Sequence, residues 1–201
     1  EISDGTIEIK GIVRDPGERT KIAVYSNDKR IDAVGACVGM KGMRIQAIVR
    51  ELNNEKIDII NWSSEPEIFV NRGLSPAKPS RIVIEEEERK IYAVLDESQI
   101  SLAIGKGGQN RRLASRLTGY DIQTIKEDEY SQLVAEETGD IPLNEIEGIS
   151  EKILQTLYMN GYETAQQVME AEITEMMEMP GIGEKTAEKL KNLVEEQFEE
   201  E

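Results

Sequence analysis

The sequence predicts an α+β fold in which one unit of strands and helices occurs twice and a small all-helical domain follows. Two observations carry this prediction. The order strand, strand, helix, helix, strand recurs, with its Gly-x-x-Gly segments 66 residues apart, and an internal repeat of this kind indicates a duplicated structural unit. After residue 126 the strand-like alternation stops and only helical patterns remain.

The first unit, residues 1–76, has five predicted elements. Alternation of apolar and polar residues predicts strands, and apolar residues spaced by three and four predict helices. In order, the elements are two strands, two helices and a strand, at residues 6–13, 20–26, 31–38, 45–52 and 56–62. The pair Pro16-Gly17 predicts the hairpin turn, and Gly39-Met40-Lys41-Gly42 separates the two helices.

The second unit, residues 77–127, repeats this order after a short amphipathic helix at residues 67–74 and a proline-containing linker. Its predicted strands and helices fall at residues 81–86, 90–95, 98–104, 109–117 and 121–126. Here Gly105-Lys106-Gly107-Gly108 separates the two helices.

The remaining residues are acidic and helical. We expect a linker at residues 128–142 and a helix-hairpin-helix domain with an acidic tail at residues 143–201. A weaker repeat supports the hairpins, because residues 146–152 match residues 179–185 at an offset of 33. The glycines of such hairpins expose backbone N–H groups, and Gly181, Ile182 and Gly183 are therefore candidate contacts.

The charge changes at the same boundary. Residues 1–126 hold 20 Lys+Arg and 19 Asp+Glu, whereas residues 127–201 hold 4 Lys+Arg and 21 Asp+Glu. The net charge of −16 thus combines +1 with −17, which indicates domains with different partners. A segment at −17 repels DNA, so we expect its hairpins to contact protein. The opposing hypothesis is a DNA-repair adaptor that uses the hairpins on DNA.

The composition excludes several classes of protein. The 201 residues contain no His and one Cys, which removes the commonest general base and any intrachain disulfide. We expect no catalytic residues, no metal and no cofactor, and hence no enzyme. No apolar run approaches the roughly 20 residues that cross a bilayer, and no signal peptide is visible, so we expect a cytoplasmic monomer without membrane contact.

Each Gly-x-x-Gly segment lies between two short amphipathic helices flanked by strands, an arrangement typical of type II KH domains, whose loop binds the nucleic-acid backbone. Glycine lets a phosphate approach the main chain, and the following helix N-terminus attracts an anion. The alternative is two helix corners with glycine caps. The candidate RNA-binding residues are Gly39, Met40, Lys41, Gly42, Arg44, Gly105, Lys106, Gly107, Gly108, Asn110, Arg111 and Arg112. With few aromatic residues nearby, we expect bases to rest in an aliphatic groove.

Longer strings resemble the tandem KH domains of the NusA family of bacterial transcription factors, chiefly at residues 34–42, 74–78 and 101–114. The resemblance covers about residues 1–126, and the acidic part is similar to the helix-hairpin-helix extension that some members carry. It implies a C-terminal fragment of a transcription termination and antitermination factor, which binds single-stranded nascent RNA through both loops and modulates RNA polymerase pausing. One departure is Ser150, where a second hairpin glycine is typical.

The resemblance also implies partners for the acidic part, namely antitermination proteins and RNA polymerase, the latter through the C-terminal domain of its α chain. The competing interpretation of the whole chain is a KH-containing accessory module of an RNA-processing enzyme or GTPase. The missing His and the missing phosphate loop count against it. A further hypothesis is autoinhibition, in which the acidic tail covers the basic edge of the KH domains and competes with RNA.

Overall fold

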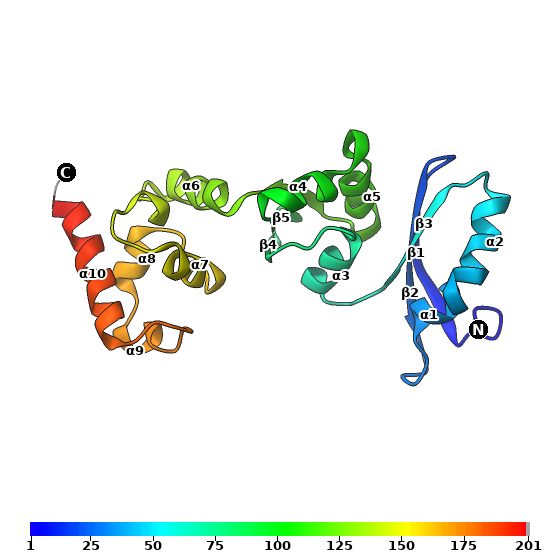
Figure 1. Ribbon diagram of the computed structural model, residues 1–201, viewed down its shortest axis with the longest axis horizontal. Helices are drawn as coiled ribbons and strands as arrows, with labels where there is room; N and C mark the ends of the chain where they lie inside the picture. The colour runs from blue at the N-terminus through cyan, green and yellow to red at the C-terminus, as the bar shows by residue number, and fades with distance from the viewer. Residues whose placement is uncertain (200–201) are drawn as a thin grey trace. The chain divides into compact units, whose positions relative to one another are not determined.

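The computed structural model of the chain describes residues 1–199. It divides into a first unit, Glu1–Thr124, and a second unit that begins at Ile125. The fold confirms the predicted class, because two type II KH domains with small sheets are followed by an all-α helix-hairpin-helix domain (Figure 1).

The first KH domain is a three-stranded sheet with two short helices. Its elements are β1 (Ile7–Asp15), β2 (Arg19–Ser26), α1 (Ala33–Val38), the 3₁₀ turn η1 (Met40–Gly42), α2 (Met43–Glu51) and β3 (Lys56–Asn61). In the sheet order β1-β2-β3, the first pair is antiparallel and the second parallel. Ile7, Val24 and Ala33 are the buried centre of the core between sheet and helices.

The predicted inward faces of α1 and α2 are partly wrong. Gly35 and Ile48, which helical spacing placed inside, are both exposed, and α1 begins at Ala33 rather than at Ile31. A capping interaction accounts for the start of α1: the Asp32 carboxylate accepts a hydrogen bond from the Val34 N–H at 3.2 Å, which favours a helix that begins at the next residue. Ile48 lies in the separate helix α2, on the face turned away from the sheet.

The second KH domain repeats the arrangement. Its elements are α3 (Pro66–Gly73), β4 (Arg81–Glu85), β5 (Lys90–Val94), α4 (Glu97–Ile104), η2 (Lys106–Gly108), α5 (Gln109–Thr118) and β6 (Asp121–Ile125), with sheet order β4-β5-β6. Val70 and Leu74, from α3 and the residue after it, are buried in the same cluster as Ile91 and Ile122. The proposed boundary between residues 76 and 77 therefore falls inside a packed segment.

The two KH domains share buried contacts. Helices α3 and α5 lie on one side of the first sheet and α2 on the other (Figure 1). Leu117 of α5 packs against Ala23 and Phe69. Buried Lys21 donates from Nζ to the Asp58 carboxylate at 3.0 Å and to the Ser75 carbonyl at 3.1 Å, and burial lowers the pKa of its ammonium. The relative position of the two domains is thus fixed by side chains.

The second unit is built from helices around its own core. They are α6 (Glu127–Thr138), η3 (Leu143–Glu145), α7 (Glu151–Met159), α8 (Ala165–Glu170), α9 (Ile173–Met176) and α10 (Glu184–Glu199). Leu157, Leu190 and Val194 are central to the core. Helix α6, which covers most of the expected linker, is attached through the Ser131 hydroxyl, which donates to the Glu163 carbonyl at 2.7 Å.

Within the described part of the chain, none of the helices combines the length and the apolar character needed to cross a membrane.

Candidate nucleic-acid interface

The two Gly-x-x-Gly loops, residues 39–42 and 105–108, adopt the same backbone. The first glycine has φ 74° and ψ 169° in one loop and φ 70° and ψ 174° in the other. The third position is left-handed in both, with φ 52° at Lys41 and φ 58° at Gly107. The fourth position, the N-cap of the following helix, has φ 78° at Gly42 and 75° at Gly108.

The first and fourth glycines are required for different reasons. A Cβ on Gly39 would lie 2.7 Å from Cγ of Arg44, and one on Gly105 would lie 2.8 Å from Cβ of Asn110. The first glycine therefore permits a close approach inside the domain. A Cβ on Gly108 would meet nothing within 4 Å, so this position faces open space and leaves the main chain accessible.

Arg44 and Asn110 occupy equivalent places two residues after each loop. The Arg44 guanidinium donates to the Ala36 carbonyl at 2.9 Å and to the Glu1 carboxylate at 2.8 Å. The Asn110 amide donates to the corresponding Leu102 carbonyl at 3.2 Å and to two further carbonyls. Asn110 is 0% exposed, whereas the Arg44 side chain is 60% exposed. In this structure the Asn110 side chain thus holds the loop and does not face solvent.

The two loops differ in the placement of charge. Lys41 is at the third position of its loop, whereas Lys106 is at the second, and both are exposed. In the first loop the second position is Met40, which is 75% exposed, and Met43 follows it at 65%. The first loop therefore combines one cation with an apolar surface. The second combines one cation with main chain that carries no side chains, because its other three residues are glycines.

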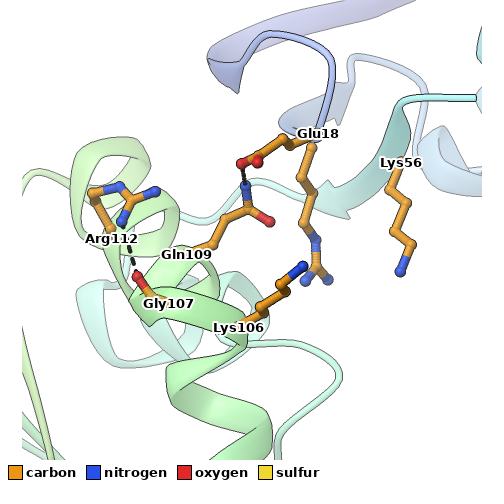
Figure 2. Close-up of a pocket in the computed structure, with 7 residues that line it drawn as sticks. Glu18, Lys56, Lys106, Gly107, Gln109 and Arg112 are labelled. Carbon is orange, nitrogen blue, oxygen red and sulfur yellow. Dashed lines mark hydrogen bonds between the residues drawn. The ribbon is translucent and has the colours of Figure 1, made fainter. Parts of the chain in front are cut away.

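A groove of about 450 Å³ adjoins the second loop (Figure 2). We call it the junction groove; its lining residues are Glu18, Arg19, Lys56, Lys106, Gly107, Gln109 and Arg112. Lys106 and Lys56, from different KH domains, extend toward the same space in Figure 2. Three of the predicted residues (Lys106, Gly107 and Arg112) are thus brought to one groove.

The other four lining residues were not predicted from the sequence. Glu18, Arg19 and Lys56 belong to the first KH domain, and their place in the groove depends on how the two domains pack. Gln109 is next to predicted residues, yet its type carries no charge signal. The Gly39–Gly42 loop and Arg44 do not line this groove.

Ion pairs determine which groove charges are available. The Asp15 carboxylate accepts from Arg112 at 2.8 Å and from Arg116 at 3.2 Å, and the Arg112 contact is the chief reason that the pKa of Asp15 is lowered. Lys56 and Lys106 form no ion pair with the described side chains, residues 1–198. The two lysines therefore supply the charge that an anionic ligand would meet first.

Glu55 holds the hairpin that carries the first-domain side of the groove. Its carboxylate is wholly buried and accepts two bonds of 2.7 Å from Arg14, one of 2.8 Å from the Gly17 N–H and one from the Thr20 hydroxyl. These donors, Arg14 first, lower the pKa of Glu55 to about 2. The carboxylate stays ionised at neutral pH and fixes the turn beside Arg19.

The hairpins of the second unit explain the departure at Ser150. Gly148 and Gly181 have φ 93° and 84°, which favours glycine. Ser150 has φ −74° as the N-cap of α7, and the equivalent Gly183 has no positive φ, so this position accepts a side chain. Of the candidate contact residues, Ile182 is buried in the core, whereas Gly181 and Gly183 are exposed.

Among the side chains that the structure describes, residues 1–198, no group of three or more His, Cys, Asp or Glu is placed to hold a metal ion.

The fold and the paired loops define a protein with two tandem type II KH domains and a helix-hairpin-helix domain. Residues 1–62 match the NusA-like first KH domain, residues 66–132 the NusA-like second KH domain, and residues 140–192 the SAM-like helix-hairpin-helix tandem. The chain belongs to the NusA family.

Curated relatives agree with this assignment. The "Transcription termination/antitermination protein NusA" of Rickettsia prowazekii is 40% identical over 197 residues, which are 96% of this chain and 39% of that protein. The proteins of the same name from Bacillus subtilis and Thermus thermophilus are 50% and 51% identical over 133 residues, which are 66% of this chain and 36% and 34% of theirs. The chain thus spans little more than a third of the length of these relatives.

Proposed function

We propose that this chain is the RNA-binding part of a transcription termination and antitermination factor. In this proposal the two Gly-x-x-Gly loops hold the backbone of single-stranded nascent RNA, and the factor modulates pausing of RNA polymerase. Membership of the NusA family and the two KH domains support it. The family assignment also favours this role over an accessory module of an RNA-processing enzyme or GTPase.

The observation that carries the proposal is the shared backbone of the two loops. In each, a left-handed residue and a left-handed glycine precede an α-helix, so the positive end of the helix dipole lies directly behind the loop and attracts an anion. The N–H groups of Met43 and Gln109 themselves donate to the Met40 and Lys106 carbonyls. A Cβ on Gly108 would meet nothing within 4 Å, and one on Gly42 only Cγ of Gln46 at 3.9 Å, so a phosphate can come close to the loop backbone. An exposed lysine stands in each loop, and a positive side chain adds a salt-dependent attraction.

The proposal assigns different roles to the predicted residues. Lys41 and Lys106 contact phosphates, and the loop glycines admit them. Arg112 extends the contact along the junction groove. Asn110 is a positioning residue, because its buried amide joins α4 to α5. Arg111 remains a candidate contact at the start of α5.

Charge reversal in each loop tests the proposal. We expect Lys41→Asp and Lys106→Asp each to weaken binding of a single-stranded RNA oligonucleotide at least tenfold, about 1.4 kcal/mol. Each should also reduce the slope of log K against log salt concentration by about one or more. Lys152→Asp, which makes the same charge change on the second unit, is the control and should leave both quantities unchanged. Wild-type affinity in both loop variants would overturn the proposal.

For the second unit we propose a protein contact rather than a DNA contact. Its 21 acidic residues against 4 basic ones oppose a polyanion and attract a basic protein surface. The proposed partners are antitermination proteins and the C-terminal domain of the RNA polymerase α chain. Duplex DNA bound at physiological salt by the full chain, and lost on Gly181→Asp, would contradict this part of the proposal.

A further inference from the structure

The junction groove carries one carboxylate among its cations. Lys56 and Lys106 enter it without an ion pair to the described side chains, and Glu18 lines the same groove. We propose that the groove receives one nucleotide of the RNA beside the second loop, with a phosphate on the two lysines and the ribose 2′-hydroxyl donating to Glu18. The groove thereby distinguishes RNA from DNA. This inference rests on the proposed function and adds a sugar-recognition site to it.

The groove is continuous with the second Gly-x-x-Gly loop. Lys106 and Gly107, the second and third residues of that loop, line it directly. A Cβ on Gly107 would meet nothing within 4 Å, so a sugar-phosphate backbone can lie against the main chain there. The volume of about 450 Å³ is within the range of about 300–1,000 Å³ that is typical of small-ligand sites. One nucleotide of an RNA held by the loop can therefore occupy the groove.

The phosphate side of the site is positive and comes from both KH domains. Lys106 belongs to the second domain, and Lys56, the first residue of β3, belongs to the first. Their side chains extend toward the same space (Figure 2). Arg19 also lines the groove but donates to the Asp58 carboxylate at 2.7 Å, so its charge is partly compensated. A phosphate next to Lys106 is thus also attracted by Lys56.

Glu18 is adjacent to Lys56 but does not neutralise it. The Lys56 N–H donates to the Glu18 carbonyl at 3.1 Å, yet the two side chains, both among those that the structure describes, form no ion pair. The Glu18 carboxylate instead accepts from the Gln109 amide at 2.7 Å through Oε2, as Figure 2 shows. Its Oε1 takes no hydrogen bond from the described residues and is available to a ligand, because each carboxylate oxygen is an acceptor.

The position of Glu18 favours the sugar as its ligand. A carboxylate beside an anion-binding site repels the anion unless the ligand also offers a donor. The RNA 2′-hydroxyl is such a donor, and it is attached to the same sugar as the phosphate, whereas the base extends away from the backbone. DNA lacks this donor, so Glu18 opposes DNA and accepts RNA.

Modified sugars locate the site in the RNA. The ligand is the tightest-binding member of a randomised single-stranded RNA pool, bound to the full chain, with a 2′-deoxy or a 2′-fluoro sugar at each position in turn. The 2′-fluoro sugar keeps the pucker of ribose but cannot donate a hydrogen bond. We expect one position at which both modified sugars weaken binding about tenfold, as the loss of a hydrogen bond to a charged group does.

Variants then assign that position to Glu18. Glu18→Ala should bind the ribose and the deoxy RNA equally, and should bind the deoxy RNA at least as tightly as wild type does, because a repulsive charge is removed. A loss of domain packing would instead weaken both RNAs. Gln109→Ala removes the hydrogen bond to Glu18 but keeps the carboxylate, and should retain the preference for ribose. Glu86→Ala, in the corresponding turn of the second KH domain, is the control.

The phosphate contact has its own test. Lys56→Ala should weaken the long RNA and should show no further loss when the linkage next to the identified ribose is a neutral methylphosphonate. An RNA of about four nucleotides, the length that one KH loop holds, should bind Lys56→Ala and wild type alike. Lys29→Ala, an exposed lysine of the same domain outside the groove, is the control. Wild-type affinity of Lys56→Ala for the long RNA would overturn this placement of the phosphate.

Failure of this inference and failure of the proposed function are distinguishable. If Lys41→Asp and Lys106→Asp weaken RNA binding but no sugar position couples to Glu18→Ala, the ribose site is wrong and the proposed function stands. The ribose site is also wrong if Glu18→Ala couples to the identity of a base, or if Gln109→Ala abolishes the preference. If the wild-type chain binds no single-stranded RNA, both are wrong.

Discussion

Asp15 of the first KH domain accepts a hydrogen bond of 2.8 Å from Arg112 of the second. Arg116 donates to the other oxygen of the same carboxylate at 3.2 Å, and Gln109 donates to neighbouring Glu18 at 2.7 Å. One turn of the first domain thus meets one face of α5. Three residues of this contact, Glu18, Gln109 and Arg112, also line the junction groove beside the second loop.

Removal of the Asp15 charge should loosen this contact. We expect Asp15→Asn to lower the melting temperature of the chain by a few degrees and to weaken binding of an RNA that spans both loops. An RNA long enough for one loop only should bind as before. Calorimetry and fluorescence anisotropy measure the two effects, and Glu86→Gln, in an exposed turn, is the control. Equal losses for the long and the short RNA would contradict the role in spacing the loops.

Glu55 should make stability depend on acid pH. Its pKa is about 2 in the folded chain against an ordinary 4.5, so its contribution to the free energy of unfolding is present above pH 4.5. That contribution is lost as the pH falls from 4.5 toward 2. Glu55→Gln should be less stable than wild type at pH 7, and the gap should shrink below pH 4.5. Urea denaturation at several pH values measures it, and a gap independent of pH would show that the carboxylate charge is unimportant.

Gly105 and Gly108, in the second loop, should differ in how well they tolerate substitution by alanine. Gly105→Ala places a side chain in a backbone region used almost only by glycine, which costs about 1–3 kcal/mol, and adds a clash at 2.8 Å. Gly108→Ala is left-handed in open space and should cost about 1–2 kcal/mol. Gly108→Ala should nevertheless weaken RNA binding, since its methyl group covers the exposed main chain. Denaturation together with RNA titration separates these effects, and equal destabilisation would refute the distinction.

Asn110 and Arg44, which occupy equivalent positions after the two loops, should contribute differently to the stability of the chain. Asn110→Ala removes donors to three carbonyls in a buried place and should lower the free energy of unfolding by about 1–3 kcal/mol. Arg44→Ala removes an exposed side chain and should change stability much less. Chemical denaturation of both variants gives the comparison. A larger loss for Arg44→Ala would mean that the equivalence of the two positions has been misjudged.

The hairpins of the second unit allow a similar comparison. Gly183→Ser copies Ser150 at a position without positive φ and should be nearly neutral. Gly181→Ser places a side chain at φ 84° and should cost about 1–2 kcal/mol. Thermal unfolding of the full chain, followed by a probe in the second unit, measures the stability of both variants. The prediction fails if Gly183→Ser lowers the stability more than Gly181→Ser.

Local features of this fold were predictable from the sequence, because the patterns that encode them span few residues. Both Gly-x-x-Gly loops, the hairpins and the order of elements depend on glycine placement and on apolar spacing. The start of α1 was missed because the Asp32 cap overrides the apolar period. Ile48, although apolar and correctly spaced, lies on the outer side of α2.

Sites assembled across the chain were not predictable in the same way. The junction groove brings Glu18 to Gln109, which is 91 residues away. Tyr25 and Trp62, at the ends of two strands, pack edge to face with ring centroids 5.8 Å apart. Neither pairing leaves a periodic trace, since each depends on strand register and on domain packing.

Buried Lys21 has a consequence for how the two loops act together. Its bonds to Asp58 and Ser75 join the first domain to the segment that leads into the second. These bonds help to keep the two loops at a fixed separation. In a bivalent binder the effective concentration of the second site is highest when the span matches the ligand and falls on either side. When the separation of the two loops is fixed, only a narrow range of RNA lengths reaches that highest effective concentration. In the proposed function, the chain would then select RNA by the number of nucleotides between the two bound phosphates.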